Sequence, residues 1–252
     1  MKPVPFALQL YSVRDVLEKD LAGGLSKVKA AGYDCVETAG TYDLDAPRFR
    51  ALLDECGLRA VSAHMDLETV TQRTPEAIVQ AHALGVRYVV MPWTDPALMN
   101  DKAAWVECGT ALDTAGAAFR QAGIRLGYHN HEHEFVRLGG KYALDILMEA
   151  ALPEHLFAQI DCYWVSFGHA DPAALIRRYT DRCPLIHIKD MSAGDERDVT
   201  EIGNGIIDWQ RVFAAGVEAG TEWYVVEQDH SKIGPIESAT ISAAFMARQL
   251  LP

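Results

Sequence analysis

The stretch 121–135 reads QAGIRLGYHNHEHEF, and it combines the three features that decide the fold. A helical pattern ends at Gly123, an apolar run over Ile124–His129 follows at once, and histidines and carboxylates close the stretch. A glycine just past a helix and just before a strand is the usual junction of an αβ unit. The chain repeats this junction as AAGYD, ECGLR, ALGVR, QAGIR and EAGTE. We therefore expect a structure made of repeated αβ units.

Short apolar runs alternate with amphipathic segments along all 252 residues. The expected strands are Pro5–Leu10, Cys35–Thr38, Ala60–His64, Tyr88–Pro92, Ile124–His129, Phe157–Asp161, Leu185–Lys189 and Trp223–Glu227. The expected helices are Leu17–Ala31, Ala46–Cys56, Pro75–Leu84, Lys102–Ala122, Ala143–Ala150, Pro172–Tyr179, Trp209–Ala219 and Pro235–Leu250. Strands separated by helices form a parallel sheet, and eight such units without a break in composition favour a closed (β/α)8 TIM barrel. We expect a single domain over residues 1–252.

Composition excludes several classes of function. The net charge is −12, with 35 acidic against 23 basic residues, so a nucleic-acid partner is not expected. No run approaches the roughly 20 apolar residues of a membrane span, and the start of the chain lacks a signal-peptide cleavage site. The 5 cysteines form no CxxC pair, which is typical of thiols in a reducing cytoplasm. Neither GxGxxG nor GxxxxGKS/T follows a strand, which argues against nucleotide binding.

Polar residues collect where the expected strands end. In a parallel barrel all these ends meet at one rim, and active sites lie there. The residues in question are Gln9, Tyr11, Glu37, His64, Trp93, His129, Asn130, His131, Asp161, His187, Lys189, Glu227, Gln228 and Asp229. The rim is therefore the expected place of the chemistry.

Four of the acidic and histidine residues suggest a metal site. Glu134, Asp161, His187 and Glu227 follow four successive apolar runs in the second half of the chain. Carboxylates and imidazoles together bind divalent metals well. Taken singly, Asp161 also fits a helix cap and His187 a satisfied core histidine. Their convergence on one rim favours the metal.

The motif YHNHEHEF offers more donors than one metal needs. Strand alternation places His129 and His131 on one face and Asn130 on the other. Glu134 lies in the loop that follows and would have to fold back over the rim. Spacing alone leaves open whether His129 or Glu134 touches the metal, and a solvated polar loop is the alternative to any site.

Further rim residues are candidates for catalysis and substrate binding. A lysine at an inward position is costly unless it is paired, so Lys189 is expected to contact a carboxylate or a developing enolate or alkoxide. Trp164 could form a wall on which a sugar ring stacks. The full set of expected substrate contacts is Gln9, Tyr11, His64, Trp93, Asn130 and Trp164.

The motifs LQLYSVRD, YHNHEHEF, QIDCYW, HIKDM, GNGIIDW and VVEQD together resemble the xylose isomerase-like TIM-barrel superfamily, specifically its sugar phosphate isomerase/epimerase group. In that family a divalent metal, often manganese, is held by Glu, Asp, His and Glu from strands five to eight. Asp161, His187 and Glu227 match the last three positions. His129 stands where the first glutamate is expected. We favour Glu134 as the ligand, which frees His129 and His131 for acid–base work.

The resemblance implies a metal-dependent isomerase or epimerase that acts on a sugar, keto sugar or cyclic polyol through an enediolate. Glu227, His129 or His131 would move the proton. The alternative is a dehydratase with the same metal site, because the family's inosose dehydratases share a Tyr-His-x-His sequence with this chain. A non-catalytic sugar-binding barrel would lack convergent titratable groups at its rim. The DNA-repair endonuclease IV members carry many more metal ligands and a DNA-binding face, which the −12 charge argues against.

The implied partners follow from this class. We expect one divalent ion, with Mn²⁺ first and Mg²⁺, Co²⁺ or Zn²⁺ as alternatives, and a small-molecule carbohydrate substrate. The sequence leaves the oligomeric state open, although barrels of this family often pair as homodimers.

Overall fold

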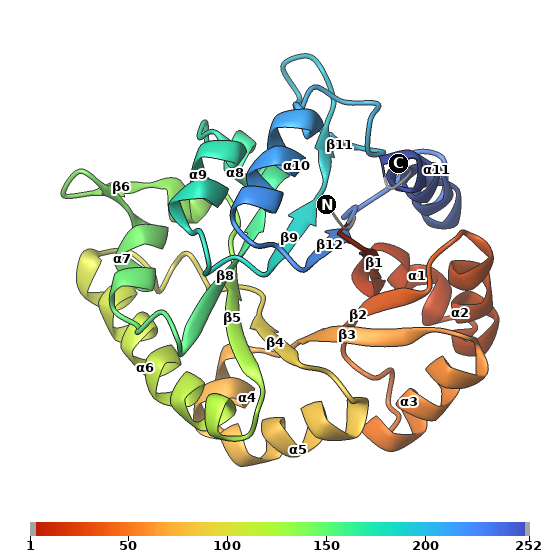
Figure 1. Cartoon of the computed structure of the whole chain (residues 1–252), viewed down its shortest axis with the longest axis horizontal. Helices are drawn as coiled ribbons and strands as arrows, with labels where there is room; N and C mark the ends of the chain where they lie inside the picture. The colour runs from red at the N-terminus through yellow and green to blue at the C-terminus, as the bar shows by residue number, and fades with distance from the viewer. Residues whose placement is uncertain (1–3, 250–252) are drawn as a thin grey trace.

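Each predicted apolar run forms a strand of one closed parallel barrel in the computed structural model, which describes residues 4–249 (Figure 1). The order around the barrel is β1-β12-β9-β8-β5-β4-β3-β2. The strands are β1 (Phe6–Gln9), β2 (Cys35–Ala39), β3 (Arg59–His64), β4 (Tyr88–Met91), β5 (Arg125–His129), β8 (Leu156–Asp161), β9 (Leu185–Ile188) and β12 (Trp223–Val226). The predicted TIM barrel is confirmed.

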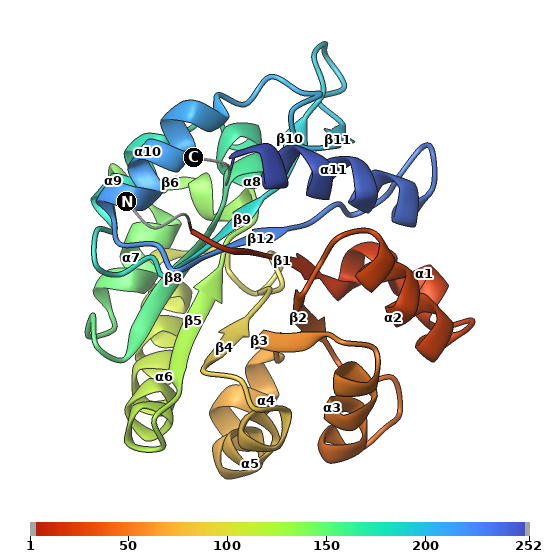
Figure 2. The ribbon, with the colours of Figure 1, turned by 45° about the vertical axis from the view of Figure 1, so that its right-hand side comes forward.

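Helices surround the ring of strands on its outer side (Figures 1 and 2). The longest of them in the described part, α6, packs along β5. The last helix, α11, packs against α2. Just after α2, the Tyr33 hydroxyl donates to the Ala239 carbonyl of α11 at 2.9 Å. The outer helices are α2 (Leu21–Ala30), α3 (Ala46–Glu55), α5 (Thr74–Leu84), α6 (Lys102–Gln121), α7 (Ala143–Glu149), α9 (Pro172–Arg178), α10 (Trp209–Glu218) and α11 (Pro235–Gln249).

The first predicted helix, Leu17–Ala31, is wrong as a single element. The structure divides it into α1 (Arg14–Leu17) and α2, because the Asp20 carboxylate accepts from the Gly23 N–H at 3.0 Å and caps a new helix. The predicted end of the last helix, Leu250, lies outside the described residues.

Short additional elements decorate the loops. Two short helices follow barrel strands, α4 after β3 and α8 after β8, and two small hairpins extend the loops that follow β5 and β9. These elements are η1 (Leu10–Val13), α4 (Leu67–Gln72), η2 (His133–Phe135), β6 (Arg137–Leu138), β7 (Lys141–Tyr142), α8 (Cys162–Phe167), β10 (Asp190–Met191) and β11 (Val199–Thr200).

Large side chains fill part of the barrel interior. The rings of Tyr88 and Phe157 meet edge to face with centroids 5.7 Å apart, and Val90 and Leu185 pack with them. Gly127 of β5 makes room for this layer, since a Cβ there would lie 2.4 Å from the Phe157 ring. The barrel is therefore a packed core rather than a channel, and space for chemistry is left at its rim.

Two further properties concern the whole described part. None of the helices within residues 4–249 has the length and apolar character that crossing a bilayer requires. All five cysteines are free thiols.

Candidate metal centre and active site

Four side chains at neighbouring strand ends converge at the rim. His129 ends β5, Asp161 ends β8, His187 lies in β9 and Glu227 directly follows β12. One donor atom from each lies within 4.8 Å of the others, and all four residues are buried. We call this group the rim tetrad. It forms because β5, β8, β9 and β12 are adjacent parallel strands, whose carboxyl ends meet at the same edge.

The chemistry of the rim tetrad fits a divalent cation. The Asp161 Oδ1 accepts from the Trp164 N–H at 2.8 Å, whereas Oδ2 is buried, has no hydrogen-bond partner and lies 3.4 Å from the Lys189 ammonium. Burial raises the pKa of Asp161 to about 6, against the opposing effect of Lys189. A buried carboxylate is costly unless cations compensate it, and Lys189 is shared among three carboxylates, so a divalent ion would add to its compensation. Two imidazoles and two carboxylates form a mixed donor set that Mn²⁺, Co²⁺ and Zn²⁺ accept.

His129 is held as a neutral imidazole. Burial, followed by the nearby His187 and His131 rings, keeps its pKa well below the ordinary value. Its Nδ1 lies 3.1 Å from the Gln159 Oε1. A neutral ring with one nitrogen engaged in this way has its other nitrogen available for a metal.

His187 bridges two carboxylates across the barrel. Its Nε2 lies 2.5 Å from the Glu37 Oε1, and its Nδ1 lies 3.1 Å from the Glu227 Oε2. Burial alone would lower the pKa of His187, but the Glu37 and Glu227 carboxylates raise it to about 10. The ring is thus fixed in position from both sides.

Lys189 is wholly buried beside the rim tetrad, with 0% of its surface exposed. Its ammonium lies 2.8 Å from Glu227, 2.9 Å from Asp229 and 3.4 Å from Asp161. Burial would lower the pKa of Lys189, but these carboxylates raise it well above the ordinary value. The lysine is a permanent positive charge that compensates the carboxylates of the site.

Glu134 lies apart from the rim tetrad. The turn η2 folds it toward the barrel wall, where its carboxylate accepts from the Tyr128 hydroxyl at 2.5 Å and the His131 N–H at 2.8 Å. Burial raises the pKa of Glu134 to about 7. Both carboxylate oxygens of Glu134 therefore hold the loop in its conformation. Of the residues in this motif, His129 is the one that lies beside Asp161, His187 and Glu227.

His131 projects into the cavity above the rim tetrad as a second neutral imidazole. Burial lowers its pKa to about 3, and Lys189 contributes to this shift. The ring lies 5.0 Å from His129 and 5.2 Å from Trp164, centroid to centroid. Its buried Nδ1 has no hydrogen-bond partner, so it can serve a substrate oxygen.

A cavity of about 460 Å³ opens at the rim. Glu227, His129 and His131 lie at its wall. Tyr11 and Trp93 also line it, with 42% and 50% of their surfaces exposed. The lining residues are Tyr11, Ala39, His64, Asp66, Pro92, Trp93, His129, His131, Glu227 and Asp229. The cavity has the size of a small-ligand site and reaches the proposed metal donors.

The structure separates the six predicted substrate contacts into two groups. Tyr11, His64 and Trp93 line the cavity, whereas Gln9, Asn130 and Trp164 are not among the lining residues. Gln9 is buried and donates to Glu37 at 2.8 Å. Asn130 accepts from the Asp161 N–H at 3.0 Å, and Trp164 packs on His131. These last three residues contact other residues of the site without lining the cavity.

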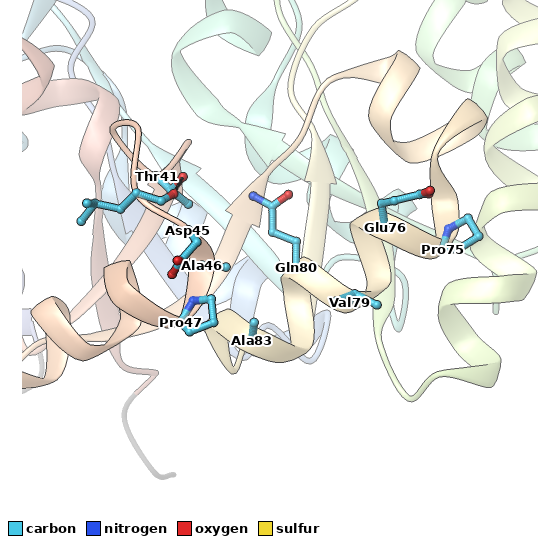
Figure 3. Close-up of a pocket in the computed structure, with 10 residues that line it drawn as sticks. Thr41, Asp45, Ala46, Pro47, Pro75, Glu76, Val79, Gln80 and Ala83 are labelled. Atoms are coloured by element: carbon cyan, nitrogen blue, oxygen red, sulfur yellow. Dashed lines mark hydrogen bonds between the residues drawn. The ribbon is translucent and has the colours of Figure 1, made fainter.

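A wider hollow of about 680 Å³ lies between α3 and α5, away from the rim tetrad (Figure 3). Its titratable groups are Asp45 and Glu76, and Asp45 is engaged as the cap of α3 through the Arg48 N–H at 2.8 Å. The hollow has no convergent donors, and we assign it no chemistry.

Two residues of the site received no role from the sequence. Glu37 lies in the middle of β2 and Gln159 lies in β8, and both are wholly buried and hydrogen-bonded to rim histidines. The sequence signal for Glu37 was present, because a carboxylate interrupts the apolar run at Cys35–Thr38. Gln159, one position from Ile160 in an apolar run, carried no comparable signal.

Comparison with known proteins assigns the family. The pattern of the xylose isomerase-like TIM barrel family matches residues 25–249. The chain belongs to this family. The resemblance inferred from the motifs is thereby confirmed.

The similar proteins are named either as dehydratases or as isomerases and epimerases. An inosose dehydratase of Lacticaseibacillus casei is 25% identical, and the alignment covers 88% of this chain and 87% of that protein. A sugar phosphate isomerase/epimerase of Parabacteroides distasonis has a similar structure, with a TM-score of 0.86, 24% identity and coverage of 100% and 96%. An L-ribulose 3-epimerase superposes with a TM-score of 0.72 at 15% identity, covering 98% and 94%. At these identities the two solved structures establish the fold.

Proposed function

We propose that the protein is a metal-dependent enzyme that removes the proton next to the carbonyl group of a keto sugar or cyclic keto-polyol. The rim tetrad, in which the buried Asp161 Oδ2 has no hydrogen-bond partner, and the cavity at its mouth carry this proposal. His129, Asp161, His187 and Glu227 would hold the cation, with Mn²⁺ as first candidate and Mg²⁺, Co²⁺ or Zn²⁺ as alternatives. When bound, such an ion supplies Lewis-acid polarisation of a carbonyl and its adjacent hydroxyl.

Glu227 is the proposed base. It belongs to the rim tetrad and also lines the cavity, so its carboxylate reaches both regions. Burial would raise the pKa of Glu227, but Lys189 and His187 hold it well below the ordinary value. The carboxylate is thus ionised near neutral pH and able to accept a proton. Lys189 keeps Glu227 ionised by compensating its charge. It contacts carboxylates and is not among the cavity-lining residues.

His131 is proposed to orient the substrate. As a neutral imidazole it can offer one N–H donor and one acceptor to neighbouring hydroxyl or carbonyl oxygens. His64 lines the same cavity. The exposed Tyr11 and Trp93 provide aromatic faces on which the apolar side of a sugar ring stacks.

Of the three carboxylates that line the cavity, Glu227 alone belongs to the rim tetrad, and this favours reactions that need one base. Epimerisation requires proton carriers on both faces of an enediolate, and a neutral histidine, His129, stands where the second carboxylate would be. We propose dehydration first, because Glu227 can take the α-proton and return it to the departing β-hydroxyl, which leaves as water, and because curated relatives are named inosose dehydratases. Isomerisation is the second candidate, since Glu227 could return the same proton to the neighbouring carbon.

The charge of the cavity supports an unphosphorylated substrate. Asp66 and Asp229 line it together with Glu227, and no lysine or arginine of residues 4–249 is among the lining residues. A phosphate dianion would face these carboxylates with no lysine or arginine among the described cavity-lining residues to bind it. We expect D-fructose to compete for the site and D-fructose 6-phosphate to compete poorly.

The experiment begins with the purified protein, treated with a chelator and then reloaded with Mn²⁺. Loaded enzyme incubated with an inosose should form a product that has lost one water by mass. Keto sugars in deuterium oxide test the second candidate, because isomerisation incorporates solvent deuterium into the isomeric product. Glu227→Gln should abolish both reactions, while Glu222→Gln, a carboxylate that bonds to Tyr88 and Arg125, should leave them intact. Turnover that persists after removal of all divalent metal would refute the proposal.

We also propose a cytoplasmic location for the enzyme. Five free cysteines support a reducing, cytoplasmic environment. The family resemblance favours a homodimer, and light scattering of the purified protein tests it.

A further inference from the structure

Glu37 lies across the barrel from β8, yet it contacts side chains from both halves of the ring. It lies in the middle of β2, has 0% of its surface exposed, and accepts hydrogen bonds from strands far apart in the sequence. Oε2 accepts from the Ser62 hydroxyl at 2.6 Å and the Gln159 amide at 2.8 Å. Oε1 meets nitrogens of Gln9 at 2.8 Å, His64 at 2.9 Å and His187 at 2.5 Å.

We propose that Glu37 is a positioning residue that sets the proton pattern of three rim histidines, so that His129 and His187 direct lone pairs toward the metal and His64 does not. The inference rests on the metal site of the proposed function. It starts from one chemical fact, that an ionised carboxylate accepts hydrogen bonds and cannot donate them. Every partner of Glu37 must then donate.

For His187 the consequence is direct. Its Nε2 must carry the proton given to Glu37, and its Nδ1 faces the Glu227 carboxylate at 3.1 Å, so that without metal both nitrogens of His187 hold a proton. A cation in the rim tetrad would displace the Nδ1 proton, because Glu37 holds the one on Nε2. Metal-binding histidines commonly donate their second N–H to a carboxylate, which fixes the ring and its tautomer. Glu37 occupies that place for His187.

For His129 the effect passes through Gln159. The Gln159 Nε2 donates to Glu37, so its Oε1 is the acceptor that faces the ring. That oxygen lies 3.1 Å from the His129 Nδ1, which must therefore hold the proton. The His129 Nε2 is left as the lone-pair donor.

For His64 the network gives the opposite result. Its Nε2 lies 2.9 Å from Glu37 and 3.0 Å from the Gln159 Oε1, so it holds a proton. The Gln9 Oε1 accepts from the Tyr11 N–H, and the Gln9 amide nitrogen therefore faces the His64 Nδ1, at 3.3 Å. Both nitrogens of His64 are engaged. This distinguishes the rim tetrad from the competing group of His64, His129 and His187, whose donor atoms also lie within 4.8 Å of one another.

The test compares Co²⁺ binding by E37Q and wild type, with calorimetry for affinity and the visible spectrum for ligand geometry. A glutamine has one acceptor oxygen and places an NH₂ group against donors, so E37Q should bind Co²⁺ about 10- to 100-fold more weakly, with an altered spectrum. E222Q is the matched control, because Glu222 is also bonded to a hydroxyl and a cation, Tyr88 at 2.6 Å and Arg125 at 3.1 Å. Wild-type affinity and spectrum in folded E37Q would overturn the inference.

A second measurement needs no variant. Nitrogen-15 spectra of histidine side chains in the Zn²⁺-loaded protein should show the proton on Nε2 of His187 and His64 and on Nδ1 of His129. The reversed pattern at His187 or His129 would overturn the inference even if E37Q fails to fold. A wild-type protein that takes up neither Co²⁺ nor Zn²⁺ would refute the proposed function instead. The tautomers of His64 and His129, read without metal, would then still decide the role of Glu37.

Discussion

Replacement of Lys189 by methionine should destabilise the metal-free protein and at the same time strengthen metal binding. The ammonium is wholly buried and lies 2.8, 2.9 and 3.4 Å from three carboxylates. Methionine fills similar space but leaves those carboxylates without their local cation. Breaking a buried ion pair by removal of one partner costs about 3–5 kcal/mol.

This loss of stability corresponds to a measurable shift in the melting temperature. For a domain of this size each kcal/mol moves the melting temperature by about 2–4 °C, so Lys189→Met should lower it by about 6–20 °C. A divalent cation is attracted to the same carboxylates and is repelled by the ammonium. Lys189→Met should therefore bind Mn²⁺ more tightly than wild type and regain stability when the metal is added.

The assay is urea unfolding with chelator present, followed by calorimetric titration of Mn²⁺. Lys141→Met is the matched control, because Lys141 also pairs closely with a carboxylate, Glu149 at 2.6 Å, but is 56% exposed. An exposed pair of this kind contributes less than about 1 kcal/mol. If Lys189→Met unfolds within about 1 kcal/mol of wild type, or binds Mn²⁺ more weakly, the electrostatic reasoning is refuted.

Three other predictions follow from the site. His129→Ala should weaken Mn²⁺ binding at least about tenfold in calorimetry, whereas Glu134→Gln should leave it unchanged; the reverse result would restore Glu134 as the ligand. Burial raises the pKa of Glu134 from 4.5 to about 7, so the folded state holds a proton there that the unfolded chain has lost. Folding stability should therefore fall by up to about 3 kcal/mol as pH rises from about 5 to 7, and urea unfolding of Glu134→Gln should lack this part of the slope. Trp93→Ala should raise KM roughly tenfold with little change in kcat, because the half-exposed ring binds substrate and transition state alike; a fall in kcat with constant KM would contradict this.

Local sequence features determined the architecture. The glycine junctions, the eight apolar runs and the polar residues at their ends each depend on a few neighbouring residues, and all eight runs form barrel strands. Once the strands are parallel neighbours, the ends of β8, β9 and β12 must adjoin. The proximity of Asp161, His187 and Glu227 follows from that topology and is therefore predictable from the sequence.

The tertiary structure decided the donors that do not follow from strand order. Glu134 and His129 are alternative metal ligands within one short motif, and the turn η2 directs Glu134 to Tyr128 and the His131 backbone, which leaves His129 beside the other proposed ligands. Glu37 and His187 are 150 positions apart, and no local pattern links them. They meet because a closed barrel brings opposite strands within reach of one interior, where a buried carboxylate must find donors wherever the fold supplies them.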